Sequence, residues 1–168
     1  MVELLALAVF AALLIYAACS DVASLTIPNW VSIALTALFI PAAFAAGMEL
    51  GTLALHLAFG FGVLVIGFFL FQANIFGGGD AKLLAATAVW TGSFAFVPFI
   101  LATAVAGGVL AIALLAARQF VPLSETTPAF VNHLLKKQNG IPYGVAIMFG
   151  GLMAIPSLPF AATSLTLP

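Results

Sequence analysis

Long uninterrupted apolar runs dominate this chain and predict helices that cross a membrane. The stretch 4–18 is apolar at every position, and His56 is the one clearly polar side chain in the stretch 53–71. A transmembrane barrel would alternate apolar and polar residues in segments of about ten. A helix suits a continuous apolar run because it satisfies its backbone hydrogen bonds within the segment. The expected spans are residues 2–20, 29–46, 50–71, 81–93, 95–117 and 141–160.

The region 81–117 is too long to cross once. As one helix it would be roughly 55 Å long at 1.5 Å per residue, whereas the hydrocarbon core is about 30 Å thick. We therefore expect a break at Thr91-Gly92-Ser93, with Pro98 just beyond as a helix-start residue. The prediction is an all-α integral membrane protein with six transmembrane helices, forming a single transmembrane domain over residues 1–168.

Composition supports this class. Of the 168 residues, 65% are hydrophobic and only 5% are charged, and the mean hydropathy is +1.30. A soluble domain carries about 25% charged residues, so a soluble domain, a disordered chain and a coiled coil are excluded. The net charge of −1 gives no basic field for nucleic acid. One cysteine, Cys19, excludes an internal disulfide and a multi-cysteine metal site.

The few charges are segregated between the two predicted sides. One side holds the connections 21–28, 72–80 and 118–140, and the other holds both termini. The positive-inside rule makes the side with the basic residues cytoplasmic, so both termini are expected outside. The basic residues on the first side are Lys82, Arg118, Lys136 and Lys137, and the second side carries Glu3 and Glu49.

The longest connection, 118–140, predicts a short amphipathic helix near residues 128–138. Thr127-Pro128 is typical of a helix cap followed by proline at the first helical position. Apolar side chains then fall on one face, so we expect the helix to lie at the cytoplasmic interface. These side chains are Phe130, Val131, Leu134 and Leu135.

The two aspartates are the candidates for chemistry. Asp21 ends the first span and Asp80 precedes the fourth, and the hairpin between them returns both acids to the cytoplasmic side. Ionisable residues at membrane depth are costly and are functional candidates by default. Two neighbouring carboxylates cannot both ionise easily, so the pair can take a proton from water and give one to a leaving amine. The alternative is that each aspartate only caps a helix.

Three glycines, Gly77, Gly78 and Gly79, directly precede Asp80. Glycine allows a close backbone approach, so a sheet-like edge beside the acid would hold an extended substrate. The alternative is a flexible turn. A phosphate-binding loop is a poor match because the spacing and the Gly-Lys-Ser/Thr ending are missing.

These segments resemble the prepilin peptidases (type IV leader peptidases), a family of aspartic proteases. Gly77-Gly78-Gly79-Asp80-Ala81-Lys82 resembles the family's GxGD signature, and Asp21 followed by Ile27-Pro28-Asn29 resembles its first motif. Ile141-Pro142-Tyr143-Gly144-Val145-Ala146-Ile147 resembles its C-terminal segment. Thr26 stands where the family usually has a basic residue.

The resemblance implies an aspartic endopeptidase in which Asp21 and Asp80 are the catalytic pair. It implies no cofactor or metal, and a multi-pass location in the bacterial cytoplasmic (inner) membrane. The substrate would be a prepilin whose short basic leader is cut after a glycine at the cytoplasmic face. Membrane lipid and the assembly and secretion machinery of type IV pili are the other expected partners. The residues expected to support the site are Asn29, Gly77, Gly78, Gly79, Lys82, Pro142, Tyr143 and Gly144.

The chain starts directly at its first span and lacks the N-terminal extension with cysteine pairs that is associated with N-methylation. It therefore resembles the short peptidases of tight-adherence (Flp-type) pilus systems. Two other classes remain open: a small transporter or channel component that uses paired acids for ions or protons, and a structural membrane subunit without chemistry. The absence of a convincing internal repeat disfavours the transporter.

Overall fold

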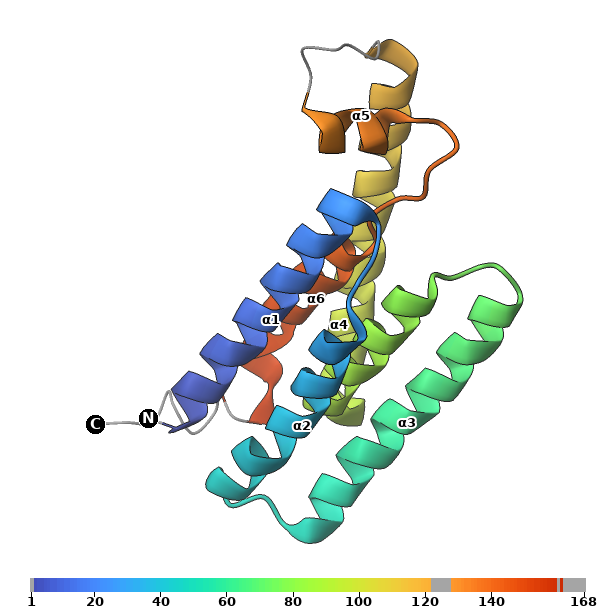
Figure 1. Cartoon of the computed structure of the whole chain (residues 1–168). Helices are drawn as coiled ribbons and strands as arrows, with labels where there is room; N and C mark the ends of the chain where they lie inside the picture. Colours follow the sequence, from blue (N-terminus) through green and yellow to red (C-terminus); the bar gives the residue numbers. More distant parts are fainter. Residues whose placement is uncertain (1, 122–127, 160, 162–168) are drawn as a thin grey trace.

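The computed structural model describes residues 2–121, 128–159 and 161 (Figure 1). The described part is helical and contains no strand, which confirms the all-α prediction. The elements are α1 (Val2–Ser24), α2 (Asn29–Ala45), α3 (Leu50–Gln72), α4 (Gly78–Phe120), α5 (Ala129–Leu135), α6 (Gly144–Ala154) and a 3-10 turn, η1 (Ile155–Ser157).

Among the described residues, three helices are long and apolar enough to cross a membrane: α1, α3 and α4. The helices α2 and α6 are apolar but shorter, and α4 contains both of the predicted spans 81–93 and 95–117. The described part is thus all-helical, with helices of the length and composition to cross a membrane, while the membrane placement and the count of six crossings stay predictions. The last predicted span is shorter than expected, because α6 begins at Gly144; Phe160 lies outside the described residues.

The expected break in the long apolar region is at Gly92. Its φ of 55° and ψ of −166° are not helical, and they lie in a region that side chains rarely adopt. The first half of α4 ends there, and the chain turns back along the second half (Figure 1). Pro98 lies inside the second half and does not start it. The prediction of a break at 91–93 is therefore confirmed.

The core joins α1, α2 and the first half of α4. The Trp90 ring lies 4.7 Å from the ring of Phe10 on α1 and 5.6 Å from that of Phe39 on α2, measured between centroids. The Trp90 indole N–H donates a 2.9 Å hydrogen bond to the Leu35 carbonyl, which satisfies its polar edge inside the core. These contacts fix the positions of the helices that carry the two aspartates.

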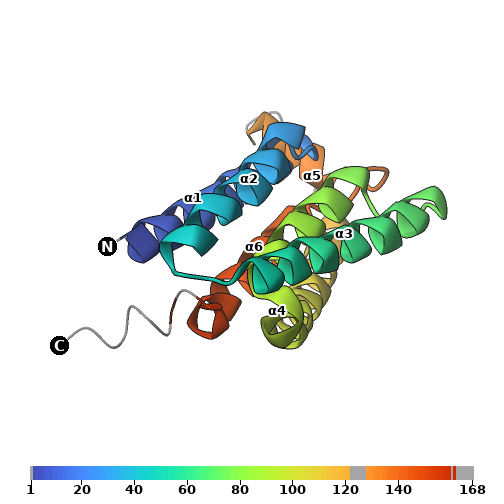
Figure 2. The same ribbon diagram turned by 90° about the horizontal axis from the view of Figure 1, so that it is seen from below.

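Seen from below, α1 and α2 lie side by side, and α3 lies beside α4 on the other side of the molecule (Figure 2). The helix α6 packs against both α1 and α4. The helices α2 and α3 each pack on α4 but hardly contact one another. This arrangement leaves a groove between α2 and α3 with α4 as its floor.

The short helix predicted in the longest connection is α5, although it covers only Ala129–Leu135. Pro128 occupies the cap position before the helix and not the first helical position; Thr127 lies outside the described residues. The Arg118 guanidinium donates to the Leu134 carbonyl at 2.9 Å and to the Gly140 carbonyl at 2.7 Å. These bonds tie α5 and the following loop to the end of α4. Its location at a membrane interface stays a prediction.

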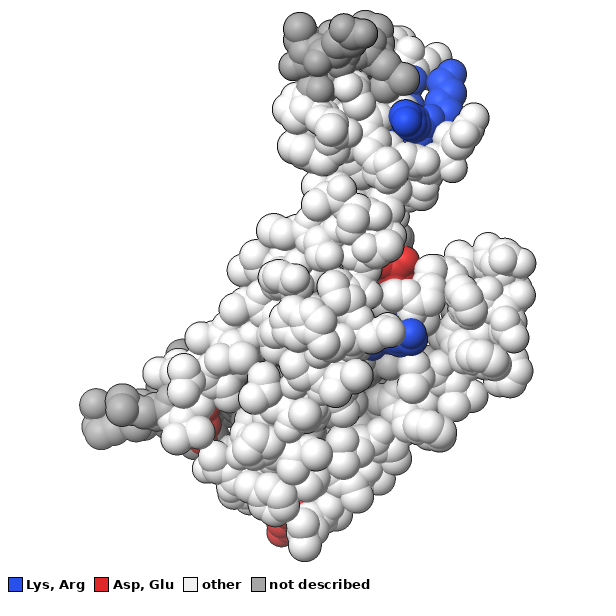
Figure 3. Space-filling view, in the orientation of Figure 1, with Lys and Arg blue, Asp and Glu red and all other residues white. Residues whose placement is uncertain are grey.

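Charged side chains collect toward the ends of the molecule (Figure 3). A basic patch lies over the end that carries α5, and acidic atoms lie at the opposite end, near the turn between α2 and α3. A further acidic and a further basic patch lie between the two ends. The predicted orientation depends on this distribution of charge.

Candidate active site

The first aspartate belongs to a helix that continues further than predicted. The helix α1 ends at Ser24 and not at Ser20, so Asp21 lies within its last turns. Leu25 follows with a φ of 53°, an uncommon value for a bulky residue, and its N–H donates to the Asp21 carbonyl at 2.7 Å. This left-handed residue turns the chain sharply out of α1.

Two serines hold the turn against the helix. The Ser20 hydroxyl donates to the Thr26 carbonyl at 2.9 Å, and the Ser24 and Thr26 hydroxyls lie 2.7 Å apart. Sequence reasoning missed this element, although two serines spaced four residues apart at the end of an apolar run were a signal for it. The turn brings Ile27 back beside Asp21, so both side chains face the start of α6.

Asp21 is only 5% exposed. Its Oδ2 atom accepts a 2.7 Å hydrogen bond from the backbone N–H of Gly144, the first residue of α6. A helix start carries unpaired N–H groups and a partial positive charge, which favours a carboxylate there. Asp21 therefore accepts from the start of a helix that lies far away in the sequence, whereas the alternative prediction placed it as a cap of its own helix.

Gly144 is required for that contact. A Cβ atom at this position would lie 2.9 Å from Asp21 Oδ2 and 3.1 Å from Ile27 Cδ1. Both neighbours are buried, so neither can move away easily.

Asp80 is half-buried in the first turn of α4. Gly77 precedes this helix in an extended conformation, with φ −70° and ψ 139°. A Cβ atom on Gly77 would lie 2.5 Å from Asp80 Oδ2, so the carboxylate folds back over the backbone that precedes it. Gly78 and Gly79 are helical. The sheet-like edge expected at the three glycines is therefore wrong, since the helix already begins at Gly78.

The two acids line one cavity of about 230 Å³. The volume is several times the ~30 Å³ that a water molecule takes up in the liquid. The residues around the cavity come from the end of α1, the turn into α2 and the start of α4. They are Asp21, Leu25, Thr26, Ile27, Asn29, Gly77, Gly78, Gly79 and Asp80.

The predicted supporting residues separate into two groups. Asn29 and the three glycines line the cavity of the acids, whereas Lys82 does not. The Lys82 ammonium donates a 2.9 Å hydrogen bond to Asn29 Oδ1, and both side chains line the groove between α2 and α3. Lys82 therefore lies next to the acid cavity and not in it.

Pro142 and Tyr143 also lie outside the lining of the cavity. The Pro142 carbonyl accepts the Val145 N–H at 3.2 Å and so helps to start α6. The Tyr143 ring packs 5.6 Å from the ring of Phe76 and against Gly107 of α4. These two residues position the start of α6, and only Gly144 of this segment reaches an acid.

Within the described residues, no group of three or more His, Cys, Asp and Glu side chains is arranged to hold a metal ion. The chemistry available at the cavity is that of two carboxylates in different surroundings. One is buried and hydrogen-bonded to backbone, and the other is half-buried at a helix start. Such a pair is suited to general acid and base catalysis on one water molecule.

The fold and the site together define an all-helical protein with apolar helices of membrane-span length and two acids near the ends of separate helices. Residues 8–112 match the model of the Type IV leader peptidase family, which is more than half of the chain, and the chain belongs to this family. Membership makes the protein a peptidase with a prepilin-type precursor as its substrate class. No curated protein and no solved structure matches the chain significantly.

Proposed function

We propose that the protein is an aspartic endopeptidase that removes the short basic leader of a prepilin by cutting after a glycine. One observation supports this above all: Asp21 and Asp80, which are remote in sequence, line a single cavity with room for water. The family match covers both acids. Both lie near helix ends, which disfavours the alternative of an ion path through the middle of the bundle.

In the proposed reaction, a water molecule between the two carboxyl groups attacks the carbonyl carbon of the scissile peptide. One carboxylate takes the proton of that water, and the other carboxyl group, which is protonated, donates its proton to the carbonyl oxygen. The tetrahedral species then collapses, the C–N bond breaks, and the amine leaves with a proton from the pair. No covalent bond to the enzyme forms.

A basic leader suits this cavity electrostatically. Of the residues that line the cavity, two are acidic and none is basic. Complementary charge steers a substrate and fixes its orientation. The substrate subclass that we propose is the Flp-like prepilins, with the leader and the site on the cytoplasmic side.

The test is cleavage of a synthetic prepilin by the purified protein in detergent. Asp21→Asn and Asp80→Asn should each lower kcat by ~10²–10⁴, the usual contribution of an acid or base. Glu49→Gln is the matched control, because Glu49 is exposed and distant in the fold, and it should cleave normally. Normal processing by Asp80→Asn would reject the assignment.

Orientation is tested in intact cells. A Lys136→Cys variant in a background without Cys19 should resist an impermeant thiol reagent until the inner membrane is opened. A Glu49→Cys variant should react at once. The reverse result would contradict a cytoplasmic active site.

A further inference from the structure

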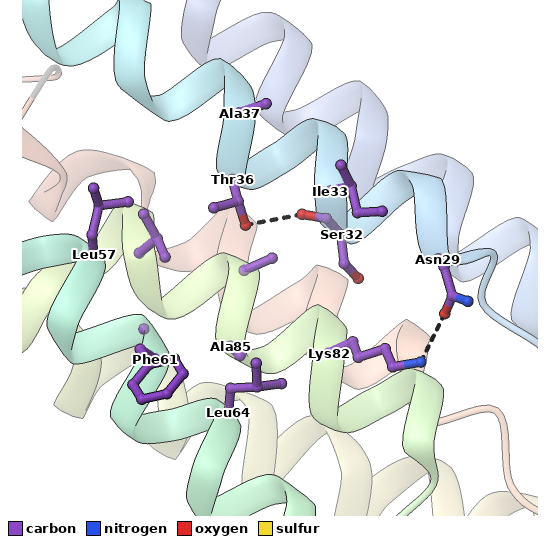
Figure 4. A pocket seen from close by; sticks show the side chains of 13 residues that line it. Asn29, Ser32, Ile33, Thr36, Ala37, Leu57, Phe61, Leu64, Lys82 and Ala85 are labelled. Carbon is purple, nitrogen blue, oxygen red and sulfur yellow. Dashed lines mark hydrogen bonds between the residues drawn. The ribbon is translucent and has the colours of Figure 1, made fainter.

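A second, larger cavity lies beside the acid site and not in it. It is a groove of about 730 Å³ between α2 and α3, with the first half of α4 as its floor (Figure 4). Leu57, Phe61 and Leu64 form the α3 wall, and Ala85 lies on the floor. Ile33 at 67% and Phe61 at 66% are exposed at its rim, so the groove opens at the surface of the molecule.

The α2 wall of the groove is unexpectedly polar. Asn29, Ser32 and Thr36 are spaced by three and four residues, which places them on one face of the helix, and all three line the groove. The Thr36 hydroxyl donates to the Ser32 carbonyl at 3.0 Å. The Ser32 hydroxyl is different: Ser32 is only 8% exposed, and its oxygen has no hydrogen-bond partner among the described residues. A buried hydroxyl without a partner is costly, so this wall is suited to a ligand that bonds to it.

Lys82 supplies a positive charge at the end of the groove where Asn29 lies (Figure 4). Its ammonium donates to the neutral Asn29 side chain and forms no ion pair with any described residue. A lysine beside apolar helices is stabilised by an anion. The groove thus combines an apolar wall with an uncompensated cation and an unpaired hydroxyl at one end.

Asn29 connects the groove to the acid site, because it lines both the groove and the acid cavity. A chain whose scissile peptide lies between Asp21 and Asp80 therefore enters the groove at Asn29 and Lys82. From Asn29 to Thr36 the polar wall extends along α2 for ~10 Å, about two helical turns.

We propose that this groove binds the apolar helix that follows the cleavage site of the precursor, and that a carboxylate in the first two turns of that helix pairs with Lys82 and Ser32. This inference rests on the proposed peptidase function. An apolar helix seated in an apolar groove is a common mode of recognition, and the carboxylate fixes its depth. Lys82 is then a residue for substrate positioning and not a catalytic residue.

The first experiment maps the groove by disulfide cross-linking. In a background with Cys19→Ala and Asp80→Asn, which binds substrate without consuming it, Phe61→Cys should cross-link to a cysteine in the apolar helix of a synthetic prepilin. Ile66→Cys is the matched control, since Ile66 is 63% exposed on the same helix but does not line the groove. Equal cross-linking at both positions would overturn the proposal.

The second experiment tests the carboxylate. A single glutamate is moved through the first eight positions after the cleavage site, with glutamine at the same position as the reference. At one position or two, glutamate should lower KM about tenfold relative to glutamine, and Lys82→Met should abolish the difference. Lys82→Glu should restore the low KM for a precursor with lysine at that position.

Each outcome decides the proposal. Equal KM values for glutamate and glutamine at every position reject the proposal. A KM that changes only with the fraction of anionic lipid, and not with the precursor, also rejects it and would make the groove a lipid site. If the protein with both aspartates leaves the precursor uncut while Phe61→Cys still cross-links, the proposed peptidase function fails and the docking surface stands.

Discussion

The Asp21 carboxylate accepts a hydrogen bond from the backbone N–H of Gly144 at 2.7 Å, across 123 positions of sequence. Gly144 lies beyond residues 8–112, the part that matches the leader peptidase family. The helix α6 therefore holds the first acid in place from outside the matched region. Since the bond ends on backbone, it depends on how closely α6 approaches α1.

Gly144→Ala should impair cleavage without unfolding the protein. The added Cβ would lie 2.9 Å from Asp21 Oδ2, so α6 must shift and the hydrogen bond must lengthen. We expect kcat to fall at least about tenfold, the equivalent of ~1.4 kcal/mol, while far-ultraviolet circular dichroism stays the same. Gly140→Ala, where an added Cβ meets nothing within 4 Å, is the control. Wild-type kcat in Gly144→Ala would show that this contact does not position Asp21.

Gly77→Ala should disturb the second acid in the same way. The Cβ would lie 2.5 Å from Asp80 Oδ2, and the backbone at φ −70° tolerates alanine, so the side chain of Asp80 must move. We expect kcat to fall by a larger factor than KM changes. The substitution displaces the catalytic carboxylate but leaves the proposed substrate groove unchanged. Gly51→Ala in the first turn of α3 has open space and should be neutral. The measurement is steady-state cleavage of a synthetic prepilin.

The break in α4 was predictable from the sequence, because the apolar region 81–117 is too long for one membrane crossing. Gly92 was the expected position of the break because glycine can adopt a non-helical backbone conformation. The end of α1 was not predictable, because Asp21 and Ser24 look in sequence like the polar residues that follow a membrane span. Only the contacts of the serines with Thr26 show that the helix continues through them. The pairing of Asp21 with Gly144 needs the tertiary fold, since nothing local in either segment indicates it.

The placement of Lys82 has a simple geometric reason. Residues two apart on a helix point to nearly opposite sides, as each residue turns the helix by about 100°. Once α4 begins at Gly78, Asp80 faces the acid cavity and Lys82 faces the groove. The predicted span begins at Ala81, which leaves Asp80 in the preceding loop, where no such rule relates its side chain to that of Lys82.

Trp90→Phe should destabilise the protein while leaving the acid cavity intact. The indole N–H donates to the Leu35 carbonyl in a core where Trp90 is 1% exposed, so the change removes one buried hydrogen bond and leaves a small void. The expected loss is ~1–3 kcal/mol, measured as a lower midpoint of thermal unfolding in detergent. Trp30→Phe, at a tryptophan that is 50% exposed, should have a much smaller effect. Equal midpoints for the two variants would contradict this view of the core.

Gly92→Ala tests whether the turn in α4 depends on glycine. The residue has φ 55° and ψ −166°, where a side chain costs ~1–3 kcal/mol, and an added Cβ would lie within 3.0 Å of three atoms of the His56 ring. That ring is not free to swing away, because His56 Nδ1 lies 2.8 Å from the Val89 carbonyl and the ring stacks on Phe39. The two penalties act together, so we expect a greater loss of stability than for Trp90→Phe.

Gly108→Ala in the second half of α4 meets nothing within 4 Å and provides the comparison, measured as thermal unfolding in the same detergent. A Gly92→Ala protein as stable as Gly108→Ala would mean that the two halves of α4 can join through an ordinary helical residue. In that case the reversal at Gly92, which returns the second half of α4 toward the end of the molecule that carries α5, would have to depend on packing alone.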